Sequence, residues 1–133
     1  MPPTVFISHA SSDKWVAGQI AKEVAAVGAV PFLDSGAIET GDEVDEELKQ
    51  ALHGASELLV LFTPAALARP YVWIEIGVAW GQGKRIIGIL HDMTTSDLAA
   101  HDGAPAFLKG IQLRDINELD TYLEELRRRV EDG

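Results

Sequence analysis

The sequence of 133 residues contains no cysteine, which excludes disulfides, zinc–thiolate sites and cysteine nucleophiles. Basic residues are scarce: 11 Lys and Arg stand against 21 Asp and Glu, a formal charge of −10. This charge would repel a nucleic-acid backbone, so we expect no direct binding of nucleic acid. No apolar run approaches the roughly 18 residues of a membrane span, and the start "MPPTVFISHA" lacks the regions of a signal peptide. These absences predict a cytoplasmic protein without membrane contact.

The chain is 47% hydrophobic, and its length suits a single domain, which we assign to residues 1–133. Short apolar runs rich in branched residues alternate with segments of helical period. The expected strands are 4–8, 29–33, 57–62 and 85–90, with a fifth short strand near Ile111–Leu113. The expected helices are 12–28, 42–53 and 117–131, with a further helix starting at Pro70 and a loop-rich stretch over 91–110. Apolar strands joined by helical crossovers predict an α/β fold, with a parallel sheet of four to five strands and helices on both faces.

In such sheets ligands bind beyond the carboxyl ends of the strands. Four segments follow those ends: Ser8–Ser12, Asp34–Asp42, Thr63–Arg69 and the loop from His91 onward. We therefore expect the functional residues to lie in or beside these segments.

Three familiar sites do not fit. The segment "GQGKR" (81–85) has Arg85 where a phosphate-binding loop requires Ser or Thr, and it follows a helix rather than opening one. Two His-Asp pairs, at 91–92 and 101–102, have no further ligands at helical spacing, so no metal is expected. A phosphoacceptor receiver domain needs an acidic cluster after the first strand, where this chain has only Asp13.

The segment "SHASSD" (8–13) has two readings that can both hold. Ser11 or Ser12 could cap the following helix, with Asp13 favouring its positive end. The small residues would also leave backbone N–H groups facing the crevice, as an anion site suited to a phosphate.

A single carboxylate, Glu75, lies within the apolar and aromatic segment "RPYVWIEIGVAW" (69–80). If Pro70 is the first helical residue, Glu75 is about the sixth, too deep in the helix for simple capping. One interpretation is an exposed edge of a mostly buried helix. The other is a functional carboxylate held at the mouth of the crevice.

Four blocks together, "VFISHASSD", "AVPFLDSGAIETGDEVDEELKQAL", "ELLVLFTPAAL" and "YVWIEIGVAWGQGKRIIGIL", resemble a TIR (Toll/interleukin-1 receptor) domain. The resemblance covers roughly residues 4–90, in the family's order and spacing. It implies a flavodoxin-like three-layer fold, with residues 34–43 as the BB loop and Glu75 as the catalytic glutamate. Enzymatic TIR domains cleave NAD⁺ between nicotinamide and ribose, and some cyclise the product.

This chemistry would explain a lone carboxylate. In NAD⁺ the leaving nitrogen is already cationic, so nicotinamide departs neutral and needs no general acid. Ordinary glycosidases use two carboxylates, one of which protonates the leaving oxygen. Here one carboxylate could hold the ribose hydroxyls and stabilise the developing oxocarbenium charge, and an apolar setting would strengthen that interaction.

The resemblance also implies which residues contact the substrate. They are Ser8, His9, Ala10, Ser11, Asp34, Ile38, Glu39 and Tyr71. The chain has Arg69 and Tyr71 where many members have Ser and Trp. It has Ala10, Ser11 and Glu43 where some enzymes carry two arginines and an aromatic residue. Phosphate contacts are therefore expected from backbone N–H groups or from elsewhere in the chain.

Three functions remain open at this point. The first is an NAD⁺ glycohydrolase of prokaryotic defence or signalling, with NAD⁺ as substrate and no cofactor, giving a linear or a cyclic product. It would assemble with other TIR domains through the loop 34–43, where Ile38 is the apolar contact. The second is a TIR interaction module without activity, and the third is an enzyme resembling nucleoside deoxyribosyltransferases, which also use a glutamate.

Overall fold

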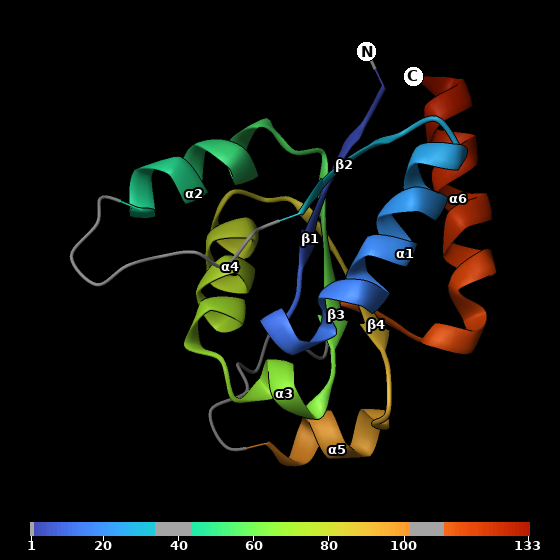
Figure 1. Ribbon diagram of the computed structural model, residues 1–133. Coiled ribbons are helices and arrows are strands. Elements are labelled where there is room, and N and C mark those ends of the chain that lie inside the picture. The colour runs from blue at the N-terminus through green and yellow to red at the C-terminus, as the bar shows by residue number, and fades with distance from the viewer. Residues whose placement is uncertain (1, 34–43, 102–110) are drawn as a thin grey trace.

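The computed structural model describes residues 2–33, 44–101 and 111–133, with only the backbone for 44–48 (Figure 1). Five strands form one sheet in which every neighbouring pair is parallel. In spatial order they are β2 (Val30–Leu33), β1 (Thr4–Ser8), β3 (Glu57–Phe62), β4 (Arg85–Leu90) and β5 (Gln112–Asp115). The order 2-1-3-4-5 is that of flavodoxin-like folds, so the predicted fold class is confirmed.

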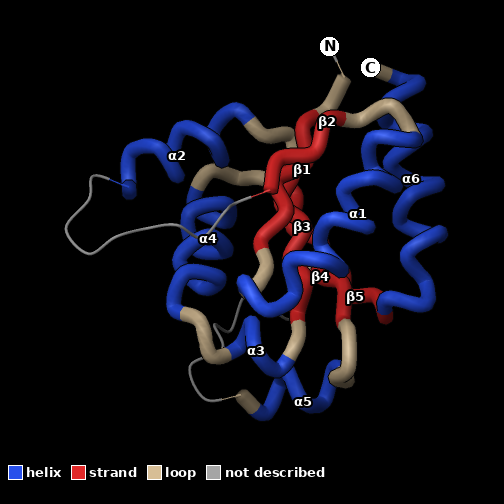
Figure 2. Tube along the Cα trace, in the orientation of Figure 1, coloured by secondary structure: helices blue, strands red, loops and turns tan. Residues whose placement is uncertain are grey.

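Helices cover both faces of the sheet, which makes three layers (Figure 2). The helices α1 (Lys14–Ala26) and α6 (Leu119–Asp132) pack on one face, and α2 (Val44–Gly54) and α4 (Pro70–Gly81) pack on the other. Two short helices, α3 (Pro64–Leu67) and α5 (Thr95–Ala100), follow the carboxyl ends of β3 and β4. No helix in the three described ranges is long and apolar enough to cross a membrane.

Alternate residues of the central strands point to opposite layers, as the period of two requires. Six alternate residues of the central strands are all buried: Val5, Ile7, Leu59, Leu61, Ile87 and Ile89. They pack against α1 and α6. Their neighbours Phe6, Leu58, Val60 and Phe62 pack against α4 on the other side. Strands that are apolar on both faces explain why these segments read as continuous apolar runs.

The structure corrects several expected boundaries. The first helix begins at Lys14 rather than residue 12, because residues 11–13 form a separate 3₁₀ turn, and no side chain caps either start. The predicted cap by Ser11 or Ser12 is therefore wrong. The helix expected to reach residue 28 ends at Ala26, and Gly28 then has a φ of 98°, a left-handed conformation that favours glycine. The stretch expected to be loop-rich contains α5, capped by Thr94, and the fifth strand starts one residue later than expected, at Gln112.

A second buried carboxylate, which the sequence reading missed, lies at the amino-terminal edge of the sheet. Glu57, the first residue of β3, accepts a hydrogen bond from the Tyr122 hydroxyl at 2.8 Å. The Arg129 guanidinium donates to both Glu57 oxygens, at 3.2 and 3.0 Å. Burial and the adjacent carboxylate raise the pKa of the Tyr122 phenol well above its usual range. These contacts join β3 to α6, so the cluster holds α6 on the sheet.

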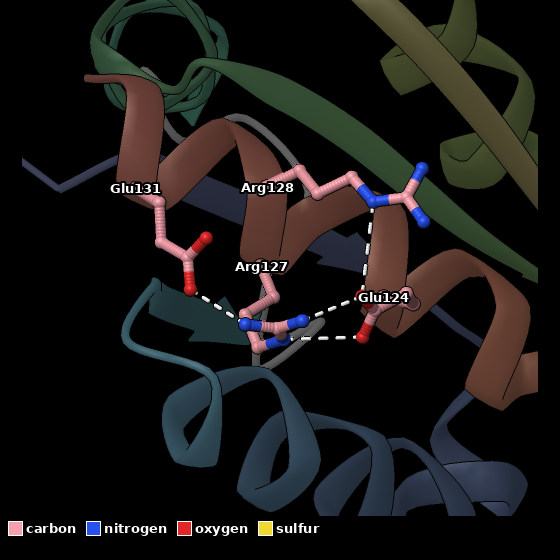
Figure 3. A network of polar contacts seen from close by, with 4 residues as sticks. All are labelled: Glu124, Arg127, Arg128 and Glu131. Carbon is pink, nitrogen blue, oxygen red and sulfur yellow. Dashed lines mark hydrogen bonds and ion pairs between the residues drawn. The ribbon is translucent and has the colours of Figure 1, made fainter.

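We expect Arg129→Met to lower the free energy of unfolding by about 2–3 kcal/mol, since it leaves the Glu57 carboxylate buried without its cation. The figure lies below that for a fully buried pair because the Arg129 side chain is 26% exposed. Arg127 is the matched control: it pairs with Glu124 and Glu131 on the solvent side of the same helix (Figure 3). Arg127→Met should leave the free energy of unfolding close to that of wild type, because solvent screens an exposed ion pair. Equal effects in urea denaturation would contradict a special role for the Glu57 cluster.

Candidate active site

The topology selects one position on the sheet for a ligand. The chain leaves β1 toward β2 on one side, and it leaves β3 toward β4 on the other side. Such a reversal opens a crevice at the carboxyl ends of the two strands. Ser8 is the last residue of β1, and Thr63 directly follows β3. Two of the four expected segments, Ser8–Ser12 and Thr63–Arg69, therefore lie at this point.

Glu75 reaches this edge from α4. It is the sixth residue of that helix, as Pro70 at the first position predicted, and its side chain is only 1% exposed. The Ser8 hydroxyl donates to Glu75 Oε1 at 2.6 Å, within the range of about 2.5–2.7 Å typical of a hydroxyl bound to a carboxylate. The interpretation of Glu75 as an exposed helix edge is thus wrong. The carboxylate is buried and joined to the end of β1.

Ser8 can make this contact because side chains along a strand point alternately to the two faces of the sheet. It lies on the same face as Phe6, the face that α4 covers, and it is itself fully buried. The Ser8 hydroxyl is at the end of an otherwise apolar strand. It therefore bonds to Glu75, the single carboxylate of the apolar helix α4. Burial of either group without a partner would be costly.

The three residues after Ser8 differ in what they expose. The side chains of His9 and Ala10 are buried, at 7% and 2% exposure, while Ser11 is exposed. His9 Nδ1 lies 3.4 Å from the Ile7 carbonyl, and Ala10 belongs to the core cluster beneath α4. Any contact that His9 or Ala10 makes with a ligand would come chiefly from the backbone, whereas the Ser11 side chain is accessible.

A threonine clamp, formed by Thr63 and Asp13, holds this loop against the end of β3. The Thr63 hydroxyl donates to Asp13 Oδ2 at 2.5 Å and accepts from the Ala66 N–H at 3.1 Å, so it also caps α3. The sequence placed Asp13 at the positive end of a helix and Thr63 in a segment beyond a strand end, but it did not predict their contact. A Thr-Pro pair directly after a strand was the available signal for the cap.

Arg69 makes a second link to the same loop. It is the residue before the first turn of α4, and one guanidinium N–H donates to the His9 carbonyl at 3.1 Å. The sequence reading noted Arg69 as a departure from the family pattern but did not predict this contact. Sixty residues separate the two partners, so only the fold brings them together.

Two aromatic residues of α4 lie near the same end of the helix. Tyr71, which was expected to contact substrate, is half-buried and packs against the core cluster. Trp73 donates its indole N–H to the Leu67 carbonyl at 3.0 Å, and its ring stacks on His101 at 5.5 Å between centroids. Trp73 therefore holds α3 and α5 to α4.

The remaining expected substrate contacts, Asp34, Ile38 and Glu39, lie outside the described residues, as does the loop 34–43. Within the described ranges, no group of three or more His, Asp or Glu side chains lies close enough together to hold a metal ion. The substrate-binding roles assigned to individual residues stay predictions.

The sheet order and the buried carboxylate beside the β1–β3 reversal define a flavodoxin-like α/β domain with a candidate crevice at the ends of β1 and β3. A family model described as "TIR domain" matches residues 5–129, and the chain belongs to the TIR domain family.

Relatives agree with this assignment. The chain is 29% identical over 96 residues to a Brachypodium distachyon protein named probable 2' cyclic ADP-D-ribose synthase BdTIR. That alignment covers 71% of this chain but only 43% of the relative, so the chain spans less than half the length of that protein.

Solved structures show the same fold. The TIR domain of the Toll-related receptor TRR-2 from Hydra magnipapillata aligns with a TM-score of 0.70 at 18% identity, over 96% of this chain and 97% of that one. The TIR domains of the activated Roq1 resistosome align with a TM-score of 0.62 at 14% identity, over 98% and 85% of the two chains. A Clostridium botulinum CMP N-glycosidase, BcmB, aligns with a TM-score of 0.60 at 19% identity, over 92% and 96%.

Thr63→Val should destabilise the domain by about 1–2 kcal/mol, because it removes the α3 cap and the donor to Asp13 together. Thr121→Val, at an exposed position of α6, is the control and should stay within about 0.5 kcal/mol. Urea denaturation of both variants measures the difference. If Thr63→Val were as stable as the control, the threonine clamp would not hold the loop after β1.

Proposed function

We propose that this chain cleaves NAD⁺ at the bond between nicotinamide and ribose, with Glu75 as the catalytic residue. One observation carries the proposal: a buried carboxylate, held by the Ser8 hydroxyl at 2.6 Å, at the switch point of the sheet. A carboxylate that served solubility would lie in water. The Glu75 carboxylate is buried instead, at the sheet edge where flavodoxin-like folds bind their ligands.

The chemistry requires little else from the chain. As the glycosidic bond breaks, positive charge develops on the ribose, and nicotinamide leaves as a neutral molecule. The Glu75 carboxylate stabilises that charge, and its apolar surroundings on α4 strengthen the attraction by excluding water. The hydrogen bond from Ser8 fixes the orientation of the carboxylate before substrate arrives, so no reorganisation is needed at the moment of reaction.

Membership of the TIR family supports the proposal, as does the relative whose name describes a cyclic ADP-ribose synthase. Linear ADP-ribose and a cyclic product both follow from the same ribosyl cation, captured by water or by a second atom of the substrate. We assign the activity to prokaryotic defence or signalling in the cytoplasm.

Two other functions compete. A TIR interaction module has no need of a buried glutamate at the crevice, so Glu75 disfavours it. An enzyme resembling nucleoside deoxyribosyltransferases would also place a glutamate at an anomeric carbon, and one neighbour in fold is a CMP N-glycosidase. Incubation with NAD⁺ and, separately, with CMP, followed by chromatography of the products, distinguishes the three: nicotinamide release, cytosine release, or neither.

Glu75→Gln should lower the rate of nicotinamide release by about 100-fold or more, since it removes the charge but keeps the shape of the side chain. The Ser8 hydroxyl can still donate to the amide oxygen, so the fold should persist by circular dichroism. Glu23→Gln, on the exposed side of α1, is the matched control and should keep full activity. Full turnover by folded Glu75→Gln would rule out charge stabilisation by this residue.

We further propose that the domain is active as an assembly formed through the loop 34–43. A head-to-tail contact through one loop builds open filaments rather than closed dimers. Activity per domain should therefore rise with protein concentration, because the competent conformation is rarely populated in the monomer. Ile38→Asp should remove this dependence, so that activity per domain stays at the low value of the monomer. Activity per domain that is constant with concentration, and indifferent to Ile38→Asp, would contradict assembly through this loop.

A further inference from the structure

The charge balance of the chain raises a problem for a substrate that carries a diphosphate. The protein has a net charge of −10, so an anionic ligand is repelled at long range and needs a local cation. Within the described ranges, four arginines are already paired with carboxylates. They are Arg114 with Glu118 and Glu125, Arg127 with Glu124 and Glu131, Arg128 with Glu124, and Arg129 with Glu57.

Arg69 and Arg85 differ from these four. No carboxylate of the described residues lies within 4.0 Å of either guanidinium. Arg85 is the first residue of β4, at the amino-terminal edge of the sheet and so away from the crevice. Arg69 is at the crevice: its partner is the neutral His9 carbonyl, in the residue next to Ser8. Its charge is therefore available, and its position is fixed.

We propose that Arg69 binds the diphosphate of the dinucleotide; this inference rests on the proposed function and deepens it. A guanidinium has five N–H donors in a rigid fork, and the bond to His9 occupies one of them. The others can hold a phosphate, in the bidentate geometry that guanidinium and phosphate share. Partial burial of Arg69 excludes some of the water that would compete.

The two contacts lie at neighbouring positions of the chain, which suits this substrate. Glu75 and Arg69 contact consecutive residues of one strand end, Ser8 and His9. In a nicotinamide dinucleotide only the ribose ring and one methylene separate the anomeric carbon from the diphosphate. With the anomeric carbon at Glu75, the diphosphate lies beside the loop that Arg69 holds.

The alternative anion site, the backbone at the start of α1, is less favourable. Asp13 lies in the 3₁₀ turn before that helix, and the Thr63 hydroxyl fixes its carboxylate there. A phosphate at this helix end would meet a negative charge already in place. Arg69 thus supplies a cation beside the loop, where Ala10 and Ser11 carry none.

The test compares two substrates on the same variants. NAD⁺ carries the diphosphate, and nicotinamide riboside has the same scissile bond without any phosphate. For Arg69→Gln we expect KM for NAD⁺ to rise about 10- to 100-fold, as for a lost charge-assisted hydrogen bond. The kinetic constants for nicotinamide riboside should change less than about twofold. Arg69→Lys should be intermediate for NAD⁺, because it keeps the charge and loses the fork.

Arg127→Gln, the same charge change on the solvent side of α6, is the control and should leave both substrates unaffected. Equal losses of activity on both substrates in Arg69→Gln would overturn the proposal, because they would mean that Arg69 only positions the loop through His9. An unchanged KM for NAD⁺ would overturn it as well.

Calorimetry with ADP-ribose separates this inference from the proposed reaction, since binding requires no turnover. We expect wild type to bind ADP-ribose at least about tenfold more tightly than Arg69→Gln. If that difference appeared in a protein that cleaves neither substrate, the proposed reaction would fail and the diphosphate site would stand. If wild type and Arg69→Gln bound ADP-ribose equally, or not at all, the diphosphate site would be wrong.

Discussion

The hydrogen bond between Ser8 and Glu75 is the constraint on which the account of this domain depends. It joins the last residue of β1 to the middle of α4, and the two residues are 67 positions apart in sequence. A carboxylate is expensive to bury, and it is retained in an interior only where polar contacts offset that cost. The bond therefore fixes how α4 lies across the end of β1, and it brings the carboxylate to the crevice edge of the sheet.

The two buried glutamates show what location does to the same side chain. Glu57, at the amino-terminal edge, is held by the Arg129 cation and the Tyr122 phenol, so its charge is used within the fold. Glu75, at the carboxyl edge, meets a hydroxyl where parallel sheets bind ligands. The first arrangement attaches a helix to the sheet. The second leaves a carboxylate at the candidate crevice, where the proposed function needs a charge.

The sequence predicted what is encoded locally. Strands β1, β3 and β4 could be predicted with their full lengths, because each is apolar on both faces and bounded by turn residues. The rule for strand ends located the crevice, and the isolated carboxylate in an apolar helix indicated Glu75. The links that build the site could not be predicted. Thr63 and Asp13 are 50 residues apart and Arg69 and His9 are 60 apart, so only tertiary packing reveals them. The expected cap by Ser11 or Ser12 was wrong because residues 11–13 form a 3₁₀ turn in place of the helix's first turn.

The central claim is that the Glu75 charge stabilises a ribosyl cation, and binding of a charged mimic tests it without requiring turnover. A pyrrolidine analogue of ribose carries a positive charge at the ring, and ribose itself is the neutral reference. The account predicts that wild type binds the cationic analogue at least about tenfold more tightly than ribose, and that Glu75→Gln loses this preference while its affinity for ribose is unchanged. An equal preference for the cation in wild type and Glu75→Gln would contradict the account.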